Sequence, residues 1–192
     1  MKKGPLNKDV EQARSSEARL ISLALNGDEQ ATNELILNMQ KIVYPMLYRQ
    51  FADKTIVEEL TQEICIKAYN ALRKFRFESS LATWIRRITL NQTSNYFKSR
   101  AFKEWKRNTL MDSEIKNSEL TPSAQLEGKQ DLHLVLQAIL ELPASLRDVL
   151  TIVSLEGCSY EEASEILNVP IGTVRSRLNK ARLLLKSCIG EA

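Results

Sequence analysis

The sequence predicts an all-α protein made of two small helical domains joined by a polar linker. Apolar residues recur at helical spacing nearly throughout the chain. Only 6 glycines and 5 prolines occur among 192 residues, too few for the many turns of an all-β sandwich or barrel. Residues 108–121 lose the periodicity and turn polar, so we place a linker there and the domains at residues 16–107 and 122–189.

Two helices are expected to open the first domain. Leu20 and Leu23 belong to a short helix that Asn26 and Gly27 end, a common carboxy-terminal signal. Asp28 is placed to cap a second helix, and Pro45 should kink or split that helix. The apolar positions of the second helix are Ala31, Leu35, Ile42 and Val43.

A third and a fourth helix complete this domain. Asp53 can cap the third, and Ser79 or Ser80 starts the fourth. The apolar seam of the third helix is Val57, Leu60, Ile64, Ala68 and Leu72. The residues of the fourth that should face inward are Leu81, Trp84, Ile85 and Ile88.

The second domain should begin at Thr121-Pro122, an N-cap followed by the proline favoured at the first helical position. A helix follows to about Glu141, and Pro143 opens another that ends at Gly157. The apolar stripe of the first is Leu132, Val135, Leu136 and Ile139, and that of the second is Leu146, Val149, Leu150 and Val153.

A helix-turn-helix is predicted next. Ser159 and Glu162 form a capping box at the start of a short helix that runs to about Leu167. Pro170 prevents that helix from continuing, and Thr173 is placed to cap a second one. A short helix, a tight turn and a second helix form this motif.

The second helix of the motif separates apolar from polar residues in the way DNA recognition needs. Val174, Leu178 and Ala181 share one face, and five basic residues without any acid lie between residues 166 and 190. The polar face holds Arg175, Ser176, Asn179, Lys180, Arg182 and Lys186. Arginine can read guanine and asparagine adenine in the major groove, while later cations meet phosphates. A solvated basic helix face is the alternative interpretation.

Residues 73–107 combine positive charge with aromatic rings. Ten cations oppose two acids, a net charge of +8. Seven of the aromatic residues lie in this window: Phe75, Phe77, Trp84, Tyr96, Phe97, Phe102 and Trp105. A polar stripe follows helical spacing through Arg87, Asn91, Ser94 and Lys98. This combination suits single-stranded DNA, although any single ring, Trp84 included, could instead be a core residue.

The face of the third helix opposite its apolar seam has another character. It carries Glu59, Gln62, Glu63 and Ile66. An acidic and amide face with an exposed isoleucine would repel DNA, so we expect a protein partner there. Simple solvation of the face is the alternative.

Several classes of protein are disfavoured by composition. No apolar run is long enough to span a bilayer, and the first residues lack the apolar stretch of a secretory signal. The cysteines, Cys65, Cys158 and Cys188, are odd in number and far apart, which argues against disulfides and metal pairs and for a reducing cytoplasm. We expect no metal, no cofactor and no catalytic residue.

Two long segments resemble bacterial sigma factors. Residues 57–100 look like the second conserved region of that family, and residues 142–185 resemble the fourth. Only the linker lies between them, which is the arrangement of the extracytoplasmic-function (ECF) subfamily. The resemblance therefore implies a region 2 helical bundle over residues 16–107 and a region 4 helix-turn-helix domain over residues 122–189.

The resemblance also implies partners and residue roles. The partners are core RNA polymerase, promoter DNA and an anti-sigma factor, with no insertion into the membrane. Polymerase would bind Glu59, Gln62, Glu63 and Ile66. The melted minus-ten strand would contact Phe75, Arg76, Phe77, Ser79, Thr83, Trp84, Arg87, Asn91 and Lys98. The minus-thirty-five duplex would be read by Thr173, Arg175, Ser176, Asn179, Lys180 and Arg182. Phe77 departs from the pattern, because many relatives carry glycine there.

Two other functions remain as alternatives. A stand-alone helix-turn-helix repressor or activator would explain residues 159–186 but not the separate basic and aromatic window. An enzyme is disfavoured, because adjacent Glu58 and Glu59 point apart on a helix and His133 has no nucleophile nearby.

Overall fold

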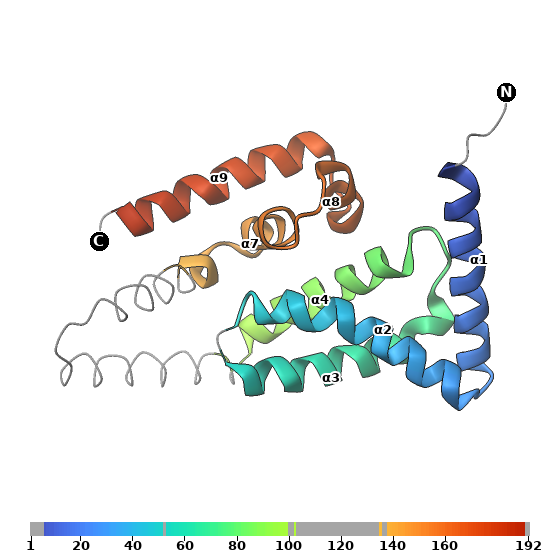
Figure 1. The fold of residues 1–192 in the computed structure, drawn as a ribbon. Coiled ribbons are helices and arrows are strands. Elements are labelled where there is room, and N and C mark those ends of the chain that lie inside the picture. Colours follow the sequence, from blue (N-terminus) through green and yellow to red (C-terminus); the bar gives the residue numbers. More distant parts are fainter. Residues whose placement is uncertain (1–5, 52, 100–101, 103–134, 136–137, 191–192) are drawn as a thin grey trace, which may run out of the picture. The chain divides into compact units, whose positions relative to one another are not determined.

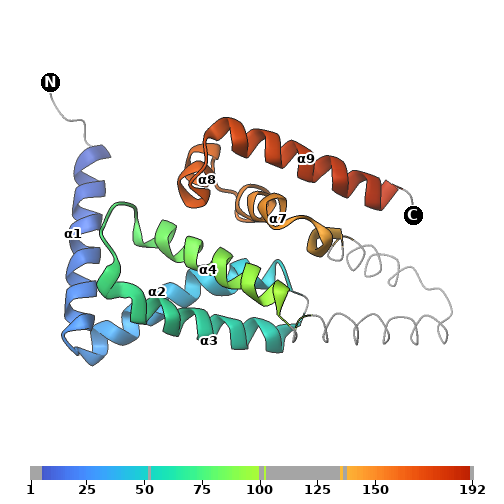
Figure 2. The ribbon, with the colours of Figure 1, turned by 180° about the vertical axis from the view of Figure 1, so that it is seen from behind.

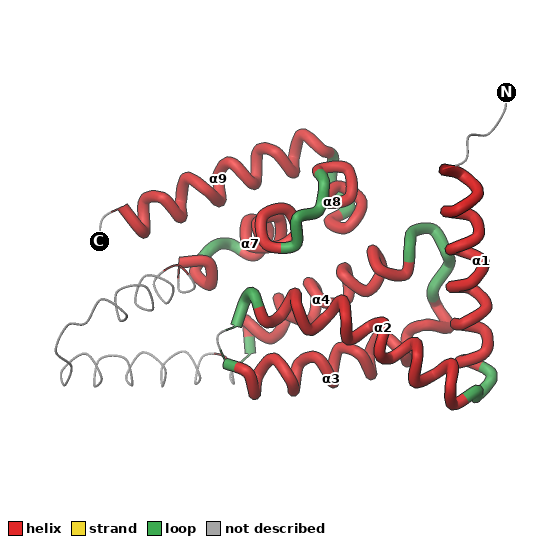
Figure 3. The backbone as a smooth tube through the Cα atoms, in the orientation of Figure 1, coloured by secondary structure: helices red, strands yellow, loops and turns green. Residues whose placement is uncertain are grey.

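The computed structural model describes residues 6–51, 53–99, 102, 135 and 138–190, and the side chains of residues 14–187 within these ranges. Helices make up all the regular structure of this part of the chain (Figure 3), which confirms the all-α prediction. The predicted linker, Thr121-Pro122, His133 and the predicted domain limits at residues 107 and 122 lie outside the described residues.

The elements follow one another as short and medium helices (Figures 1 and 2). They are α1 (Leu6–Leu25), α2 (Glu29–Tyr48), α3 (Lys54–Ala71), the 3₁₀ turn η1 (Leu72–Lys74), α4 (Leu81–Lys98), α7 (Ala144–Leu150), the π-helical segment η2 (Thr151–Leu155), α8 (Tyr160–Leu167) and α9 (Ile171–Gly190). They divide into two compact units, residues 1–48 with 53–89 and residues 49–52 with 90–192.

The first unit is built on α2, which packs against α1 and α3 (Figures 1 and 2). The predicted seam of α3 is buried along its whole length. It meets fully buried side chains of α2: Leu35, Met39, Val43, Met46 and Leu47. Leu81 and Ile85 of α4 are buried as well. The helical spacing predicted the seam of α3 and part of the rest, because Ala31, Leu35, Val43, Leu81 and Ile85 are buried as expected. Ile42, Trp84 and Ile88 were also expected on the apolar faces but are only half-buried, and Met39, Met46 and Leu47 were not predicted.

Local side-chain caps begin three of these helices where the sequence predicted them. Asp28 Oδ1 accepts from the Ala31 amide at 2.8 Å, and Asp53 Oδ1 accepts from the Thr55 amide at 2.9 Å. Ser80, rather than Ser79, begins α4, because its Oγ accepts from the Thr83 amide at 3.1 Å. Each cap gives a partner to an amide that the first turn of a helix leaves free.

Two expectations for this unit need correction. The first helix is not short, because it extends from Leu6 to Leu25. Of the two outcomes expected at Pro45, a kink or a split, the split is wrong, because the second helix continues through Pro45 to Tyr48. The cost of a proline inside a helix is offset here by Met46 and Leu47, which are completely buried immediately after it.

The second unit contains α7, η2, α8 and α9, where α9 packs against both α7 and α8. Its core is Leu146, Val149, Leu150, Ile152, Ala163, Ile166, Val174, Leu178 and Ala181. The predicted cap at Thr173 was wrong. Helix α9 begins two residues earlier, because the carbonyl of Pro170 already accepts from the amides of Thr173 and Val174.

Candidate functional sites

The turn between α8 and α9 is fixed at both ends by short-range hydrogen bonds. Ser159 Oγ accepts from the Glu162 amide at 3.1 Å, and Glu162 Oε2 accepts from the Ser159 amide at 2.8 Å, which confirms the capping box. Helix α8 ends at Leu167, and the next residue, Asn168, caps it with a left-handed φ of 51°. Ser164 Oγ then donates to the Val169 carbonyl at 2.6 Å. These bonds hold the amino-terminal end of α9 at a set angle to α8.

The predicted DNA-reading residues of α9 lie on its free face. Arg175, Ser176, Asn179, Lys180 and Arg182 are exposed, and Thr173 is half-buried. The opposite face is closed, because Val174, Leu178 and Ala181 are at most 1% exposed. A helix with this division can lay its polar face in a major groove without disturbing its own core.

Two of these arginines contact neighbouring elements. The Arg175 guanidinium lies 5.6 Å from the centre of the Tyr160 ring of α8. Arg182 Nη2 lies 3.5 Å from Ser154 Oγ of η2. Tyr160 was not identified from sequence, since the contact joins residues that are 15 positions apart. The contact with the Tyr160 ring restricts the directions that the Arg175 side chain can take.

Phe75 and Phe77 of the loop between η1 and α4 form a row of three rings with Trp84 of α4. The Phe75 ring centre lies 4.7 Å from that of Phe77 and 5.2 Å from that of Trp84. Phe75 is buried, Trp84 is half-buried, and Phe77 is 44% exposed. Phe75 and Phe102 are core residues, so their rings are not available to stack on DNA. Phe77 presents its ring to solvent, so it is the ring of this row that a base could reach most easily.

The remaining predicted minus-ten residues surround this loop or follow it on α4. Arg76 is exposed in the loop, Ser79 is half-buried, and Thr83 Oγ1 accepts a 2.9 Å hydrogen bond from Ser80 Oγ. On α4, Arg87 is half-buried, while Asn91 and Lys98 are exposed. All the polar members of the set can therefore be reached from solvent.

A contact from α1 supports the start of α4. Glu17 Oε2 accepts from the Leu81 amide at 3.2 Å, and a hollow of about 360 Å³ lies between α1, α2 and α4 beside it. A carboxylate is favourable at a helix amino terminus, where free amides and the helix dipole are positive. Sequence reasoning missed Glu17, because its partner is 64 residues away.

The predicted protein-binding face of α3 is exposed along its length. Glu59, Gln62 and Glu63 are all exposed, and Ile66 is 62% exposed, an unusual position for a large apolar side chain. Glu63 pairs with Lys67 one turn later at 2.5 Å. This face lies opposite the buried seam, as the spacing predicted.

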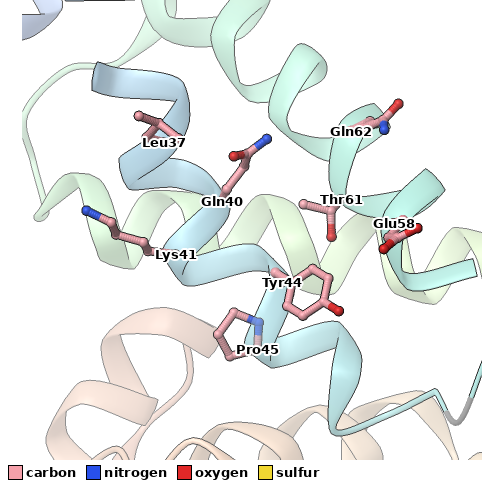
Figure 4. A pocket seen from close by; sticks show the side chains of 8 residues that line it. All are labelled: Leu37, Gln40, Lys41, Tyr44, Pro45, Glu58, Thr61 and Gln62. Atoms are coloured by element: carbon pink, nitrogen blue, oxygen red, sulfur yellow. The ribbon is translucent and has the colours of Figure 1, made fainter. Parts of the chain in front are cut away.

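A hollow of about 420 Å³ adjoins this face between α2 and α3 (Figure 4). Helix α3 contributes Glu58, Thr61 and Gln62, and α2 contributes Leu37, Gln40, Lys41, Tyr44 and Pro45. Leu37 is 56% exposed. The sequence did not predict that these α2 residues border the α3 face. One signal was available, because Leu37 is a large apolar residue that lies off the apolar seam of its helix. The hollow extends the exposed face of α3 onto a second helix.

Cys65 and the acidic side chains of the described residues are candidates for reactive or metal-binding groups. Burial raises the pKa of the Cys65 thiol to about 11, so this thiol stays protonated and unreactive. Within the described ranges, no three histidine, cysteine or acidic side chains come together as a metal site. None of the helices that the structure describes has the length and apolar character that a bilayer crossing needs.

Comparison with known proteins gives two family matches, one in each half of the chain. Residues 35–103 match the family described as Sigma-70 region 2, and residues 132–185 match the family described as Sigma-70, region 4. The first match covers α3, the aromatic loop and α4, and the second covers the helix-turn-helix. The basic and aromatic window and the recognition helix thus fall in separate regions of one family.

Full-length relatives show the same similarity. The chain is 31% identical to the ECF RNA polymerase sigma-E factor of Haemophilus influenzae, over 88% of this chain and 93% of the relative. It is 33% identical to the protein of the same name from Escherichia coli K12, over 85% and 88%. It is 32% identical to the RNA polymerase sigma-H factor of Pseudomonas aeruginosa, over 88% and 91%.

A solved structure supports the fold. The chain is similar to CnrH, solved in complex with the cytosolic domain of CnrY, with a TM-score of 0.61 and 22% sequence identity. The similarity covers 90% of this chain and 96% of CnrH.

Proposed function

This chain belongs to the ECF family of RNA polymerase sigma factors, and from that membership we propose how its surfaces are divided between polymerase and promoter DNA. The protein binds core RNA polymerase and directs it to particular promoters. The observation that carries this function is the presence of a region 2 and a region 4 match in one chain. A stand-alone helix-turn-helix regulator would account for the second match alone.

Helix α9 reads the minus-thirty-five duplex. Its free face presents Arg175, Ser176, Asn179 and Lys180, and Thr173 and Arg182 flank them. Arg175 lies in the first turns of the helix, where a recognition helix contacts base edges, and Lys180 and Arg182 suit phosphates. No acid on this helix opposes the approach of the DNA backbone.

The aromatic loop and α4 hold the melted minus-ten strand. The contacts that we assign are Arg76, Phe77, Ser79, Thr83, Trp84, Arg87, Asn91 and Lys98. The support is the net charge of +8 over residues 73–107, the exposed cations and the partly exposed rings. Phe75 is buried, so its role is to support the neighbouring rings rather than to stack on a base.

The exposed face of α3 binds core polymerase through Glu59, Gln62, Glu63 and Ile66. Its acidic charge fits a protein surface and disfavours DNA. The hollow between α2 and α3 continues this surface, and Leu37 and Tyr44 give it the apolar area that a stable interface needs (Figure 4).

The remaining expectations follow from family membership. The protein acts by binding, without catalysing a reaction of its own, and it works in the cytoplasm. Its domains span residues 16–107 and 122–189, and residues 108–121 thread through polymerase between them. An anti-sigma factor holds it inactive until a signal releases it.

Reconstituted transcription tests the proposal. The full chain, added to core polymerase, should produce run-off transcripts from particular promoters, while core polymerase alone should not. Glu59→Lys with Glu63→Lys should prevent co-purification with core polymerase, because the charge of the docking face is reversed. The matched control Glu141→Lys changes an exposed acid outside that face. Tight binding of the isolated chain to promoter duplex, with no dependence on polymerase, would contradict the proposal.

A further inference from the structure

Helix α1 contacts both elements that flank the loop of the proposed minus-ten site. This loop, residues 75–80, connects η1 to α4 and lies beside α1 in both views (Figures 1 and 2). Where the loop begins, α1 packs against η1. Where it ends, Glu17 Oε2 of α1 accepts from the Leu81 amide at 3.2 Å, at the start of α4. One helix thus holds both ends of the loop, although it is distant from the loop in sequence.

Close packing does not secure the start of α4 on the side of Glu17. A hollow of about 360 Å³ adjoins the contact, and its lining includes Leu20 of α1, Ile42 of α2 and Ala82 of α4. These three side chains are half-buried. Where apolar side chains do not fill the space between two helices, dispersion contacts hold the helices weakly. The carboxylate of Glu17 therefore has a large share in setting where the first turn of α4 lies relative to α1.

The charge of Glu17 strengthens this contact. The first turn of a helix has free amides and the positive end of the helix dipole, so a carboxylate there makes a charge-assisted hydrogen bond. Ser80 Oγ accepts from the Thr83 amide at 3.1 Å and so satisfies another amide of the same turn. Ser80 belongs to the loop and moves with it, whereas Glu17 belongs to another helix. Of these two groups, Glu17 is the one that can fix the turn against the rest of the unit.

We propose that Glu17 is a positioning residue for promoter opening, which holds the loop and the start of α4 in the arrangement that captures the melted strand. The inference rests on the proposed sigma function and deepens it, because Glu17 lies outside the surfaces assigned to polymerase and DNA. Arg76, Phe77 and Trp84 lie on the loop or in the first turn of α4, so a shift of that turn moves them together. Without the carboxylate the turn takes several positions, and the fraction of molecules in the competent one falls.

The test uses holoenzyme made from core polymerase and the full chain. Its templates are a promoter selected by the wild-type holoenzyme and the same promoter with a pre-melted minus-ten segment. Glu17→Ala should weaken binding to the pre-melted template about fivefold, since a capping hydrogen bond contributes at this scale. Affinity for core polymerase, and the formation of closed complexes on the intact duplex, should remain as in wild type.

Two further variants separate the hydrogen bond from the charge of the hollow. Glu17→Gln has no charge but keeps an oxygen that can accept from the Leu81 amide, so it should recover most of the lost binding. Glu34→Ala, the matched control, removes an exposed carboxylate that lines the same hollow, and it should bind as wild type does. Each variant is measured well below its melting transition, as followed by circular dichroism, so that loss of folded protein does not contribute.

Four results would overturn the inference. These are wild-type affinity of Glu17→Ala for the pre-melted template, no recovery by Glu17→Gln, an equal loss in Glu34→Ala, or an equal loss of affinity for core polymerase. The last would show that Glu17 supports the whole unit rather than the loop. If the wild-type chain gives no promoter-specific transcription at all, the proposed sigma function fails, which is a different outcome from failure of the Glu17 series alone.

Discussion

At the scale of single residues, the second unit depends on one buried arginine. Arg147 is 7% exposed, and its guanidinium donates to three main-chain carbonyls, those of Ile139, Leu140 and Leu142. Burial lowers the pKa of this group, and the neighbouring Asp148 acts in the opposite direction. The side chain joins the end of the helical segment before Pro143 to α7, so its contribution is structural.

Removal of this guanidinium should destabilise the fold. In Arg147→Met, the three carbonyls lose their donor at 2.8–3.2 Å, so we expect the free energy of unfolding to fall by about 3 kcal/mol. Urea denaturation followed by circular dichroism measures this loss. Arg175→Met, which changes an exposed arginine, should alter stability by less than about 0.5 kcal/mol. Equal effects of the two changes would show that the carbonyl contacts do not matter.

The left-handed backbone of Phe77 can be tested by two variants that both lack the ring. Phe77→Gly and Phe77→Ala differ by one Cβ atom, and that atom is strained at a φ of 58°. We therefore expect the glycine variant to be more stable than the alanine variant by about 1 kcal/mol. Thermal melting of the two proteins side by side gives the difference. Alanine equal to or better than glycine would show that the loop does not keep this conformation.

At the scale of elements, the helix-turn-helix of α8 and α9, which we propose as the recognition unit, has a fixed angle between its two helices. The capping box begins α8, Asn168 ends it, and the buried Val174 and Leu178 hold α9 against it. Arg175 also contacts the ring of Tyr160 on α8. The exposed face of α9, to which we assign DNA reading, is therefore positioned largely by residues that lie outside that face.

Loss of the capping box should weaken this unit without changing its surface charge. In Ser159→Ala, the Glu162 amide loses its acceptor at 3.1 Å, which should lower the free energy of unfolding by about 1 kcal/mol. Chemical denaturation monitored by circular dichroism detects it. Ser176→Ala is a suitable control, because that exposed hydroxyl bonds a carbonyl of its own helix and caps nothing. A loss as large for Ser176→Ala would contradict the assignment.

The two ends of α9 should contribute differently to promoter binding. Arg175→Ala should cost about 1–3 kcal/mol and relax preference at one base position, because an arginine near the amino end reads a base edge. Lys186→Ala should weaken binding of all sequences alike and lower the salt slope by about one, as expected of a phosphate contact. Holoenzyme binding to promoter variants at several salt concentrations separates the two. Unchanged promoter choice by Arg175→Ala would falsify the reading role.

At the scale of the whole molecule, charge is segregated although the total is small. The net charge is +3, yet residues 73–107 carry +8 with ten cations against two acids. Five further cations without an acid lie between residues 166 and 190, so the rest of the chain is acidic. The docking face of α3 belongs to that acidic remainder. The same molecule can thereby attract DNA at two surfaces and present a different charge to a protein partner.

One half-buried carboxyl, that of Asp148, should make the stability of the whole molecule depend on pH. Burial raises the pKa of Asp148 from 3.8 to about 6, and the positive charges of Arg147, Arg177 and Lys98 offset this only in part. Between these two pH values the folded protein holds a proton that the unfolded chain has released. The free energy of unfolding should therefore fall as pH rises from about 4 to 6, by roughly 3 kcal/mol from this group.

Asp148→Asn tests this linkage because it removes the titrating group. Melting temperatures of wild type and variant, measured from pH 4 to 7, should draw apart as pH rises, with the variant more stable at pH 7. Parallel curves over this range would mean that the Asp148 carboxyl titrates normally. The difference between wild type and Asp148→Asn removes the contribution of the other carboxyl groups, because these titrate in both proteins.

The sequence by itself determined the helical class, the buried seam of α3, the caps at Asp28, Asp53 and Ser159, and the family. These features depend on residues that lie within one or two helical turns, so their spacing in the chain is sufficient to predict them. The tertiary structure alone decided that α2 continues through Pro45, that Glu17 supports α4, and that Phe77 is left-handed with an open ring. The first two depend on packing between segments that are distant in sequence, and such packing outweighs local preference. The third is a left-handed backbone at a residue other than glycine, which a side chain with a Cβ atom rarely adopts and which its sequence neighbours do not predict.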